Sequence, residues 1–182
     1  LIWKKKICIV DYGTGNLLSI ERAIEKLGQK VTVSNDHDII LNSTHIILPG
    51  VGAFGKAMDS IRNLNLEKVL IQCGKDNKFI MGICLGMQLL CSDSDEFEFK
   101  KGLDLIPGRV VSLKNILNEK KIKVPNIGWL NLIEKNNKET NQICNQINKK
   151  ESFYFIHSFV AITDKKYQIY NSSYCSVEFQ AI

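Results

Sequence analysis

A cysteine between two glycines is the first feature of this sequence that points to chemistry. Cys84 stands in Gly82-Ile83-Cys84-Leu85-Gly86, after a short apolar run and before residues with helical spacing. A G-x-nucleophile-x-G sequence between a strand and a helix forms a sharp elbow that turns the nucleophile outward. We therefore expect Cys84 to be a nucleophile whose thiolate is favoured by the start of the following helix. The alternative is a structural cysteine in a glycine-containing turn.

Two sets of backbone amides are expected to stabilise the charge that such a nucleophile creates. Attack on a carbonyl produces an oxyanion, and the N–H of the residue after the nucleophile, here Leu85, commonly donates to it. A second glycine loop, Pro49-Gly50-Val51-Gly52-Ala53-Phe54-Gly55, follows another apolar run and has amides that can complete an oxyanion hole. This loop matches neither G-x-x-x-x-G-K-[ST] nor G-x-G-x-x-G, which disfavours the alternative of phosphate binding.

Alternating strands and helices are expected to position both loops. Strands are predicted over 6–10, 30–34, 45–48 and 79–81, and helices over 17–27, 57–74 and 85–90. His37 is assigned to a connecting segment, and the strand before Gly82 is expected to be buried. The pattern predicts an α/β fold with a central, mostly parallel sheet flanked by helices, in which both glycine loops lie at the carboxyl edge.

From about residue 97, the apolar runs become shorter and glycine and proline interrupt them. Extended segments are predicted over 109–113, 152–156 and 173–180, separated by glycine and proline, and they indicate an antiparallel extension of the sheet. The polar stretch 134–150 is expected to form a loop or an exposed helix. With no long linker, we expect a single domain spanning residues 1–182.

Three segments together resemble a known family. They are Ile9-Val10-Asp11-Tyr12-Gly13-Thr14-Gly15-Asn16-Leu17, Ile47 to Gly55, and Met81-Gly82-Ile83-Cys84-Leu85-Gly86-Met87-Gln88-Leu89-Leu90. They resemble the glutaminase subunits of imidazole glycerol phosphate synthase, which are class I glutamine amidotransferases with a flavodoxin-like fold. Further segments follow in the family's order up to Tyr154-Phe155-Ile156-His157-Ser158-Phe159.

The resemblance implies a reaction and roles for particular residues. Cys84 would attack the side-chain amide of glutamine, release ammonia and form a thioester that water hydrolyses to glutamate. Gly52 and Leu85 would hold the oxyanion. The residues implied to bind glutamine are Gly50, Gln88, Glu96, His157, Ser158 and Phe159.

The resemblance also implies a partner. In the family, ammonia passes to a cyclase subunit, which completes a step of histidine biosynthesis as a heterodimer with the glutaminase. Tyr12, Asn16, Trp129 and Tyr154 lie in segments that resemble the family's partner-facing surface. The alternative for Trp129 is an ordinary half-buried aromatic residue. Leu130 departs from the family, which usually has asparagine there.

The histidine and glutamate that complete the family's catalytic triad are not found in this sequence. In the family they belong to a C-terminal Q-F-H-P-E-K-S motif, in which the histidine is the base and the glutamate orients it. We therefore expect the domain to be truncated after Ile182. His37 and His45 are predicted far from the nucleophile, and His157 already has an implied role in substrate contact.

Composition excludes several classes of protein. The 182 residues carry a net charge of +5, but lysines interspersed with asparagine, as at 136–138 and 148–150, indicate solvated loops more than a nucleic-acid surface. No apolar run approaches the length of a membrane span and no signal peptide is evident. Six cysteines without a C-x-x-C pair disfavour structural zinc and disulfides, and Cys8 and Cys73 fall in apolar segments. We expect a cytoplasmic protein without cofactor, metal, nucleic acid or membrane.

Two other functions remain open from the sequence. One is a paralogous subunit that supplies ammonia for surface-sugar biosynthesis, since residues around the glutamine site do not separate the two pathways. The other is a catalytically incomplete subunit that only docks on the cyclase.

Overall fold

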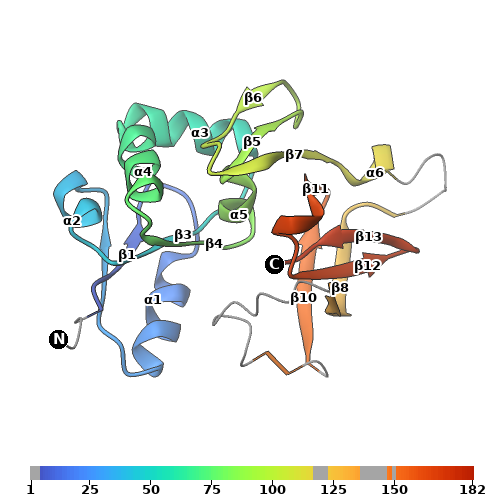
Figure 1. Ribbon diagram of the computed structural model, residues 1–182, viewed down its shortest axis with the longest axis horizontal. Coiled ribbons are helices and arrows are strands. Elements are labelled where there is room, and N and C mark those ends of the chain that lie inside the picture. The colour runs from blue at the N-terminus through green and yellow to red at the C-terminus, as the bar shows by residue number, and fades with distance from the viewer. Residues whose placement is uncertain (1–4, 117–122, 136–146, 149–150) are drawn as a thin grey trace. The chain divides into compact units, whose positions relative to one another are not determined.

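The computed structural model describes residues 5–116, 123–135, 147–148 and 151–182 (Figure 1). The chain divides into two compact units, Leu1–Leu105 and Ile106–Ile182. Each is described by itself below, and the single domain predicted from the sequence stays a prediction.

Unit 1 contains a four-stranded parallel sheet in the order β2-β1-β3-β4. Its elements are β1 (Ile7–Val10), α1 (Leu17–Lys26), β2 (Val31–Ser34), α2 (His37–Leu41), β3 (His45–Leu48), α3 (Phe54–Asn63), α4 (Leu66–Lys75), β4 (Phe79–Gly82), α5 (Leu85–Leu89), β5 (Cys91–Ser94) and β6 (Lys100–Lys101). In Figure 1, α1 lies on one side of the sheet and α2, α3 and α4 on the other, as right-handed crossovers require. The predicted α/β layering is confirmed.

The strand order brings three loops together at the carboxyl edge of this sheet. Connections leave β1 and β3 in opposite directions, and ligand sites in open α/β sheets form at such a switch point. Leu48 pairs with Gly82, so the loops after β3 and β4 begin side by side. The predicted placement of both glycine loops at one edge is therefore confirmed.

Two predictions about helices are wrong. The helix expected over 57–74 is two helices, α3 and α4, because Asn65 takes a left-handed conformation with φ 55° that breaks the ladder. His37 was assigned to a connecting segment, but it opens α2, which Asp36 caps by accepting from the Ile39 N–H at 2.9 Å.

The prediction that β4 is buried is also wrong. Phe79 and Met81 are 63% and 53% exposed, because β4 is an edge strand of the parallel sheet. The buried core of unit 1 is instead formed by β1, β3 and the inner faces of the helices, where Ile9, Leu48, Met58 and Leu70 are fully buried.

Unit 2 is built from antiparallel strand pairs. Its elements are β7 (Ile106–Ser112), α6 (Leu113–Ile116), β8 (Asn126–Asn131), β9 (Ile133–Glu134), β10 (Ser152–His157), β11 (Phe159–Thr163), a 3-10 turn (Lys165–Tyr167), β12 (Tyr170–Tyr174) and β13 (Val177–Gln180). The pairs are β7–β11, β8–β10, β12–β13 and β9–β12. The predicted change to antiparallel structure is confirmed.

One predicted strand of unit 2 is a hairpin. The segment 173–180 reverses at Cys175 and Ser176, which have φ 51° and 67°, so that β12 pairs with β13. Leu113, Val160 and Phe179 form the core of this unit, and Leu130 packs against it. The departure from the family at Leu130 is thus an inward-facing, packed position.

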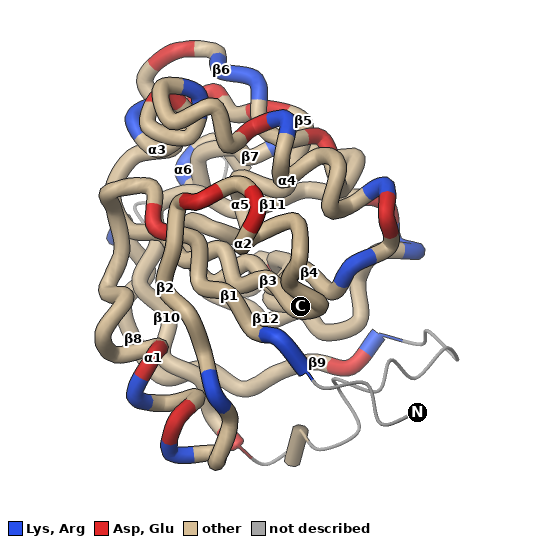
Figure 2. Tube along the Cα trace, turned by 90° about the vertical axis from the view of Figure 1, so that its left-hand side faces the viewer, with Lys and Arg blue, Asp and Glu red and all other residues tan. Residues whose placement is uncertain are grey.

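Some sequence expectations lie wholly or largely outside the described residues. They include the lysine-rich stretches at 136–138 and 148–150 and most of the polar stretch 134–150, of which Glu134 belongs to β9. Figure 2 shows Lys and Arg interspersed with Asp and Glu along the described trace. Within the described ranges, no helix has the length and apolar character needed to cross a membrane.

Candidate active site

The backbone at Cys84 has the strained conformation of an elbow between a strand and a helix. Cys84 follows β4 by one residue, precedes α5, and has φ 56° and ψ −116°. Residues other than glycine rarely adopt such angles, and they persist where surrounding structure enforces them, often at functional sites. The thiol of Cys84 is exposed. The predicted outward-facing elbow is therefore present.

Two glycines make the elbow possible by removing steric conflicts. A Cβ on Gly82 would lie 2.5 Å from Met87 Cα, because the strand passes directly under the first turn of α5. A Cβ on Gly86 would lie 1.8 Å from the carbonyl oxygen of Leu48. These contacts explain why the flanking residues are glycine, and they hold the end of β3 tightly against α5.

The loop from Pro49 to Ala53 packs directly on this elbow. A Cβ on Gly50 would lie 2.8 Å from both Gly86 N and Leu85 Cβ, so the two glycine loops are in close contact. Gly50 is buried, whereas Val51 and Gly52 are exposed, and Gly52 has φ 93°. The exposed middle of this loop therefore stands beside the turn that carries Cys84.

Leu85 and Gly52, the predicted oxyanion donors, lie on the elbow and on the glycine loop that packs against it, and their role as donors stays a prediction. Leu85 is the first residue of α5, so its N–H has no acceptor within the helix. The Gly52 amide belongs to the loop packed on the same turn. The helix that follows Cys84, α5, has only 5 residues.

Three residues implied to bind glutamine, Gly50, Gln88 and Glu96, lie in unit 1 with Cys84. Gln88 is half-buried in α5, and its backbone N–H donates to the carbonyl oxygen of Cys84 at 3.4 Å. Glu96 lies in the loop between β5 and β6, where its Oε2 accepts from the N–H of Phe54 at 2.7 Å. Phe54 is the first residue of α3, and Ala53 before it provides no side-chain cap. Glu96 therefore caps α3, a contact that sequence reasoning missed.

The residues implied to face a partner in unit 1 have different environments. Asn16 is exposed and caps α1 by accepting from the Ser19 N–H at 3.3 Å. Tyr12 is only 1% exposed, and its hydroxyl donates to the carbonyl oxygen of Pro49 at 2.6 Å. The Tyr12 side chain consequently supports the glycine loop and offers no exposed contact, in disagreement with its expected surface role.

His157 in unit 2 has both ring nitrogens engaged. Nδ1 lies 3.1 Å from the carbonyl oxygen of Phe159, which only accepts, so Nδ1 carries the proton. Nε2 then accepts from Nδ2 of Asn126 at 2.8 Å. Burial lowers the pKa of His157, so the neutral ring is favoured. The ring is held as a neutral, fully bonded group.

Ser158 and Phe159 follow His157 at the junction of β10 and β11. The carbonyl oxygen of Ser158 accepts from the Leu113 N–H at 2.8 Å, and Phe159 begins β11. Both are half-buried in unit 2. The contribution of this segment to glutamine binding stays a prediction.

Trp129 and Tyr154 lie on one exposed face of unit 2. They are directly paired across β8 and β10, and their ring centroids are 5.5 Å apart. Ile127 and Ile156 form the next pair on the same face, and all four side chains are more than half exposed. The alternative of an ordinary half-buried Trp129 is wrong, because its side chain is 69% exposed.

His37 and His45 are engaged away from Cys84. Nε2 of His37 contacts the carbonyl oxygen of Leu64, and His45 stacks on Phe79. His45 pairs with Phe79 at the amino end of β4, whereas Cys84 follows the carboxyl end of that strand. The predicted separation of His45 from the nucleophile is confirmed.

The other cysteines of the described residues differ from Cys84. Burial raises the pKa of Cys8 and Cys91 to about 11, and it also raises the pKa of Cys73. Cys175 is exposed at the tip of the β12–β13 hairpin, and Cys144 lies outside the described residues. Among the residues that the structure describes, no three His, Cys, Asp or Glu side chains gather as a metal site would require.

Comparison with known proteins identifies the class to which this fold and site belong. The model of the class-I glutamine amidotransferase family matches residues 8–180. The chain belongs to the class-I glutamine amidotransferase family. The fold predicted from the sequence is thereby confirmed.

Several similar proteins share a name that is more specific than the family's, imidazole glycerol phosphate synthase subunit HisH. The protein of that name from Sulfurimonas denitrificans is 35% identical over 173 residues, covering 95% of this chain and 82% of the relative. The one from Geobacillus sp. is 36% identical over 178 residues (97% and 82%), and the one from Bacillus cereus strain AH187 is 40% identical over 157 residues (85% and 70%).

Solved structures show the same fold at lower identity. PurLQS from Thermotoga maritima has a TM-score of 0.66 at 21% identity, covering 97% of this chain and 77% of that chain. A structure described as a glutamine amidotransferase has a TM-score of 0.59 at 13% identity, covering 86% and 73%.

Proposed function

We propose that this chain is the glutaminase subunit of an imidazole glycerol phosphate synthase and acts in histidine biosynthesis. The observation that carries the proposal is the strained, exposed Cys84 elbow with the glycine loop packed on it. Relatives named HisH, 35–40% identical over most of the chain, support the choice of this synthase within the family. We also propose a cytoplasmic location, where a nucleophilic thiol stays reduced.

In the proposed reaction, Sγ of Cys84 adds to the side-chain amide carbon of glutamine. The carbonyl oxygen becomes an oxyanion that accepts hydrogen bonds from the amides of Leu85 and Gly52. The carbon–nitrogen bond then breaks, the amide nitrogen takes up a proton and leaves as ammonia, and a thioester remains on Cys84. Water cleaves the thioester to give glutamate and the free thiol. In this proposal, Gln88 and Glu96 contact the rest of the glutamine.

None of the chain's three histidines is proposed as the base of this reaction. His37 and His45 are bonded away from Cys84, and both ring nitrogens of His157 have partners. The proposal for this chain therefore concerns the nucleophile, the oxyanion donors and the glutamine site.

Selective labelling of Cys84 tests the proposed activity. The probe is a glutamine analogue in which a chloromethyl ketone replaces the side-chain amide; Sγ displaces chloride and a thioether forms. We expect this probe to modify Cys84 much faster than Cys175, the other exposed cysteine of the described residues, and glutamine to slow the labelling of Cys84 alone. Peptide mapping by mass spectrometry measures both sites. Equal labelling of the two cysteines, unaffected by glutamine, would leave docking without catalysis as the better function.

We further propose that the exposed face of β8 and β10 binds the cyclase subunit. Four large apolar side chains gather there, Ile127, Trp129, Tyr154 and Ile156, and such exposed clusters mark interaction sites. Central aromatic residues usually dominate binding, so Trp129→Ala is expected to weaken the complex about 30-fold or more in calorimetry. Ile162→Ala is the control, since Ile162 is exposed on β11 outside this face. Equal affinities of wild type and Trp129→Ala would contradict the proposed surface.

A further inference from the structure

The glycine loop between β3 and α3 is hydrogen-bonded at both ends and exposed in the middle. We call residues Pro49 to Ala53 the oxyanion loop, because Gly52 is the donor proposed there. At its start the Pro49 carbonyl accepts from the Tyr12 hydroxyl, and at its end the Phe54 N–H donates to Glu96. Between these bonds, Val51 and Gly52 are exposed.

Tyr12 is well suited to hold the start of the loop. Its ring is fully buried beside Gly50, where a Cβ would lie 2.8 Å from the Tyr12 hydroxyl. Burial raises the pKa of Tyr12 above its ordinary value, so the hydroxyl stays protonated and donates. The bond to Pro49 joins the loop after β1 to the loop after β3 across the switch point of the sheet.

Glu96 is held as firmly at the other end. Its backbone N–H donates to Oγ of Ser94, which is fully buried at the end of β5. Its carboxylate supplies the cap that Ala53 lacks, at the end of a helix where negative charge is favourable. One oxygen, Oε2, makes this bond, and a carboxylate has a second oxygen for a substrate ammonium group.

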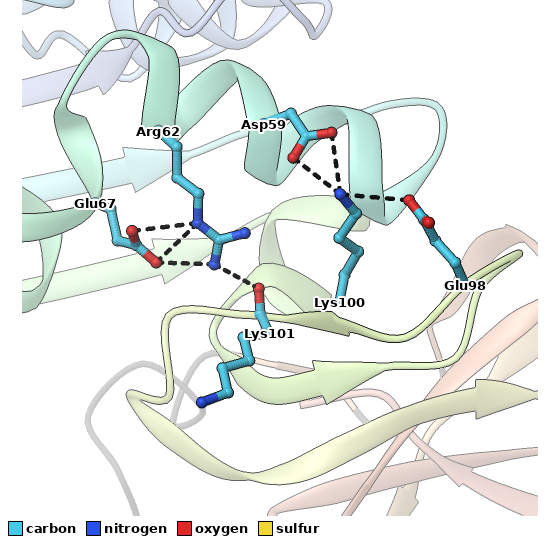
Figure 3. A network of polar contacts seen from close by, with 6 residues as sticks. All are labelled: Asp59, Arg62, Glu67, Glu98, Lys100 and Lys101. Carbon is cyan, nitrogen blue, oxygen red and sulfur yellow. Dashed lines mark hydrogen bonds and ion pairs between the residues drawn. The ribbon is translucent and has the colours of Figure 1, made fainter.

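The hairpin of β5 and β6, which carries Glu96, also contacts α3 further along the helix. Lys100 on β6 forms ion pairs with Asp59 at 3.2 Å and Glu98 at 3.3 Å. Arg62 donates to the Lys101 carbonyl oxygen at 2.8 Å and pairs with Glu67 (Figure 3). Glu96 at the start of α3 and these contacts further along it keep the hairpin and the helix in register.

We propose that Tyr12 and Glu96 are positioning residues that hold the two ends of the oxyanion loop, so that its exposed amide meets the oxyanion formed at Cys84. The proposal rests on the proposed glutaminase function. It gives Tyr12 a role inside the protein, and it gives Glu96 a second role besides contact with glutamine.

Paired probes separate positioning from thiol reactivity. With the glutamine-like chloromethyl ketone, Sγ first adds to the carbonyl carbon, which makes the carbonyl oxygen an oxyanion. The carbonyl then re-forms as sulfur shifts to the adjacent carbon and chloride leaves, which gives the thioether. Methyl methanethiosulfonate has no carbonyl; Sγ attacks its sulfur, a mixed disulfide forms and methanesulfinate leaves. Tyr12→Phe is expected to slow ketone labelling of Cys84 about tenfold, the equivalent of one positioning hydrogen bond, and to change the thiosulfonate rate less than about twofold.

Tyr174→Phe is the matched control for Tyr12→Phe. It also removes a tyrosine hydroxyl that donates to a backbone carbonyl, that of Lys123, but in unit 2. Both rates at Cys84 should stay at the wild-type value. Unchanged ketone labelling in Tyr12→Phe, or an equal fall with both probes, would overturn the role of Tyr12.

Glu96 needs a ketone without the amino-acid head group, because the carboxylate is also expected to contact glutamine. With chloroacetone, Glu96→Ala should label Cys84 more slowly than wild type, whereas Glu96→Gln keeps an oxygen that accepts from Phe54 N and should stay near wild type. Glu25→Ala, which removes an exposed carboxylate from the last turn of α1, is the control. Wild-type rates for Glu96→Ala would overturn the positioning role.

The two proposals fail in different ways. If the glutaminase function is wrong, wild-type Cys84 is neither selected by the glutamine analogue nor protected by glutamine. If only the positioning role is wrong, wild type is labelled as expected, and the Tyr12 and Glu96 variants label Cys84 at the wild-type rate.

Discussion

The two units of this chain place their candidate functional residues by different means. In unit 1, Cys84 and the oxyanion loop lie on turns after parallel strands, and their geometry depends on contacts too close for any side chain beyond glycine. In unit 2, Trp129 and Tyr154 lie on paired strands, where alternation alone sends them to one face. A turn of the first kind tolerates little change in shape, whereas a strand face tolerates many side chains.

The largest expected effect is the loss of that close packing. Gly86→Ala would bring a Cβ to 1.8 Å from the Leu48 carbonyl oxygen, so we expect it to lower the free energy of unfolding by at least about 3 kcal/mol. Gly128→Ala on β8, where a Cβ meets nothing within 4 Å, should change it by less than about 0.5 kcal/mol. Urea unfolding followed by circular dichroism measures both. Similar losses in the two variants would remove the contrast between the units.

Strain at the nucleophile predicts a variant that is more stable and inactive. Because a residue other than glycine at such angles costs about 1–3 kcal/mol, Cys84→Gly should raise the free energy of unfolding by about 1 kcal/mol after the entropy cost of glycine. Cys84→Ala keeps the strain and serves as the control. If the two variants unfold at the same urea concentration, the elbow is not strained.

The pH dependence of stability probes unit 2. The folded pKa of His157 is lowered, so its neutral form stabilises the fold above the unfolded pKa of about 6.5, and this contribution is lost as pH falls below that value. The two proteins share a general loss of stability in acid. Between about pH 7.5 and about pH 5, which bracket the unfolded pKa, we expect the free energy of unfolding to fall further in wild type than in His157→Gln. Hydrogen exchange across 152–163 localises the difference. Parallel pH curves for the two proteins would contradict it.

The smallest expected effect concerns the β12–β13 turn. Ser176 has φ 67°, which glycine adopts without steric cost, so Ser176→Gly should stabilise the chain by about 0.5 kcal/mol. Ser173→Gly, on strand β12, is the control and should destabilise it. Thermal unfolding of the two variants checks the sign. A loss in Ser176→Gly would mean that the serine side chain has a role of its own in the turn.

Sequence reasoning succeeded where a short pattern sets the local backbone. Gly82 to Gly86 predicted the elbow, and the runs before each glycine loop predicted parallel strands ending at one edge. It failed where neighbouring elements decide. Nothing in Phe79 to Met81 says that β4 is an outer strand, and Asn65 breaks a helix that its periodic neighbours would continue.

By itself, the sequence determined the α/β layering, the glycine loop after β3 and the Cys84 turn between Gly82 and Gly86. These features are local, because they depend on strand and helix periodicity and on the residues that tight turns require. Only the tertiary structure decided that Tyr12 is buried on the Pro49 carbonyl and that Glu96 caps a helix 42 residues earlier in the chain. Such bonds join residues whose distance in space depends on how all the intervening strands and helices pack. No local pattern encodes that distance.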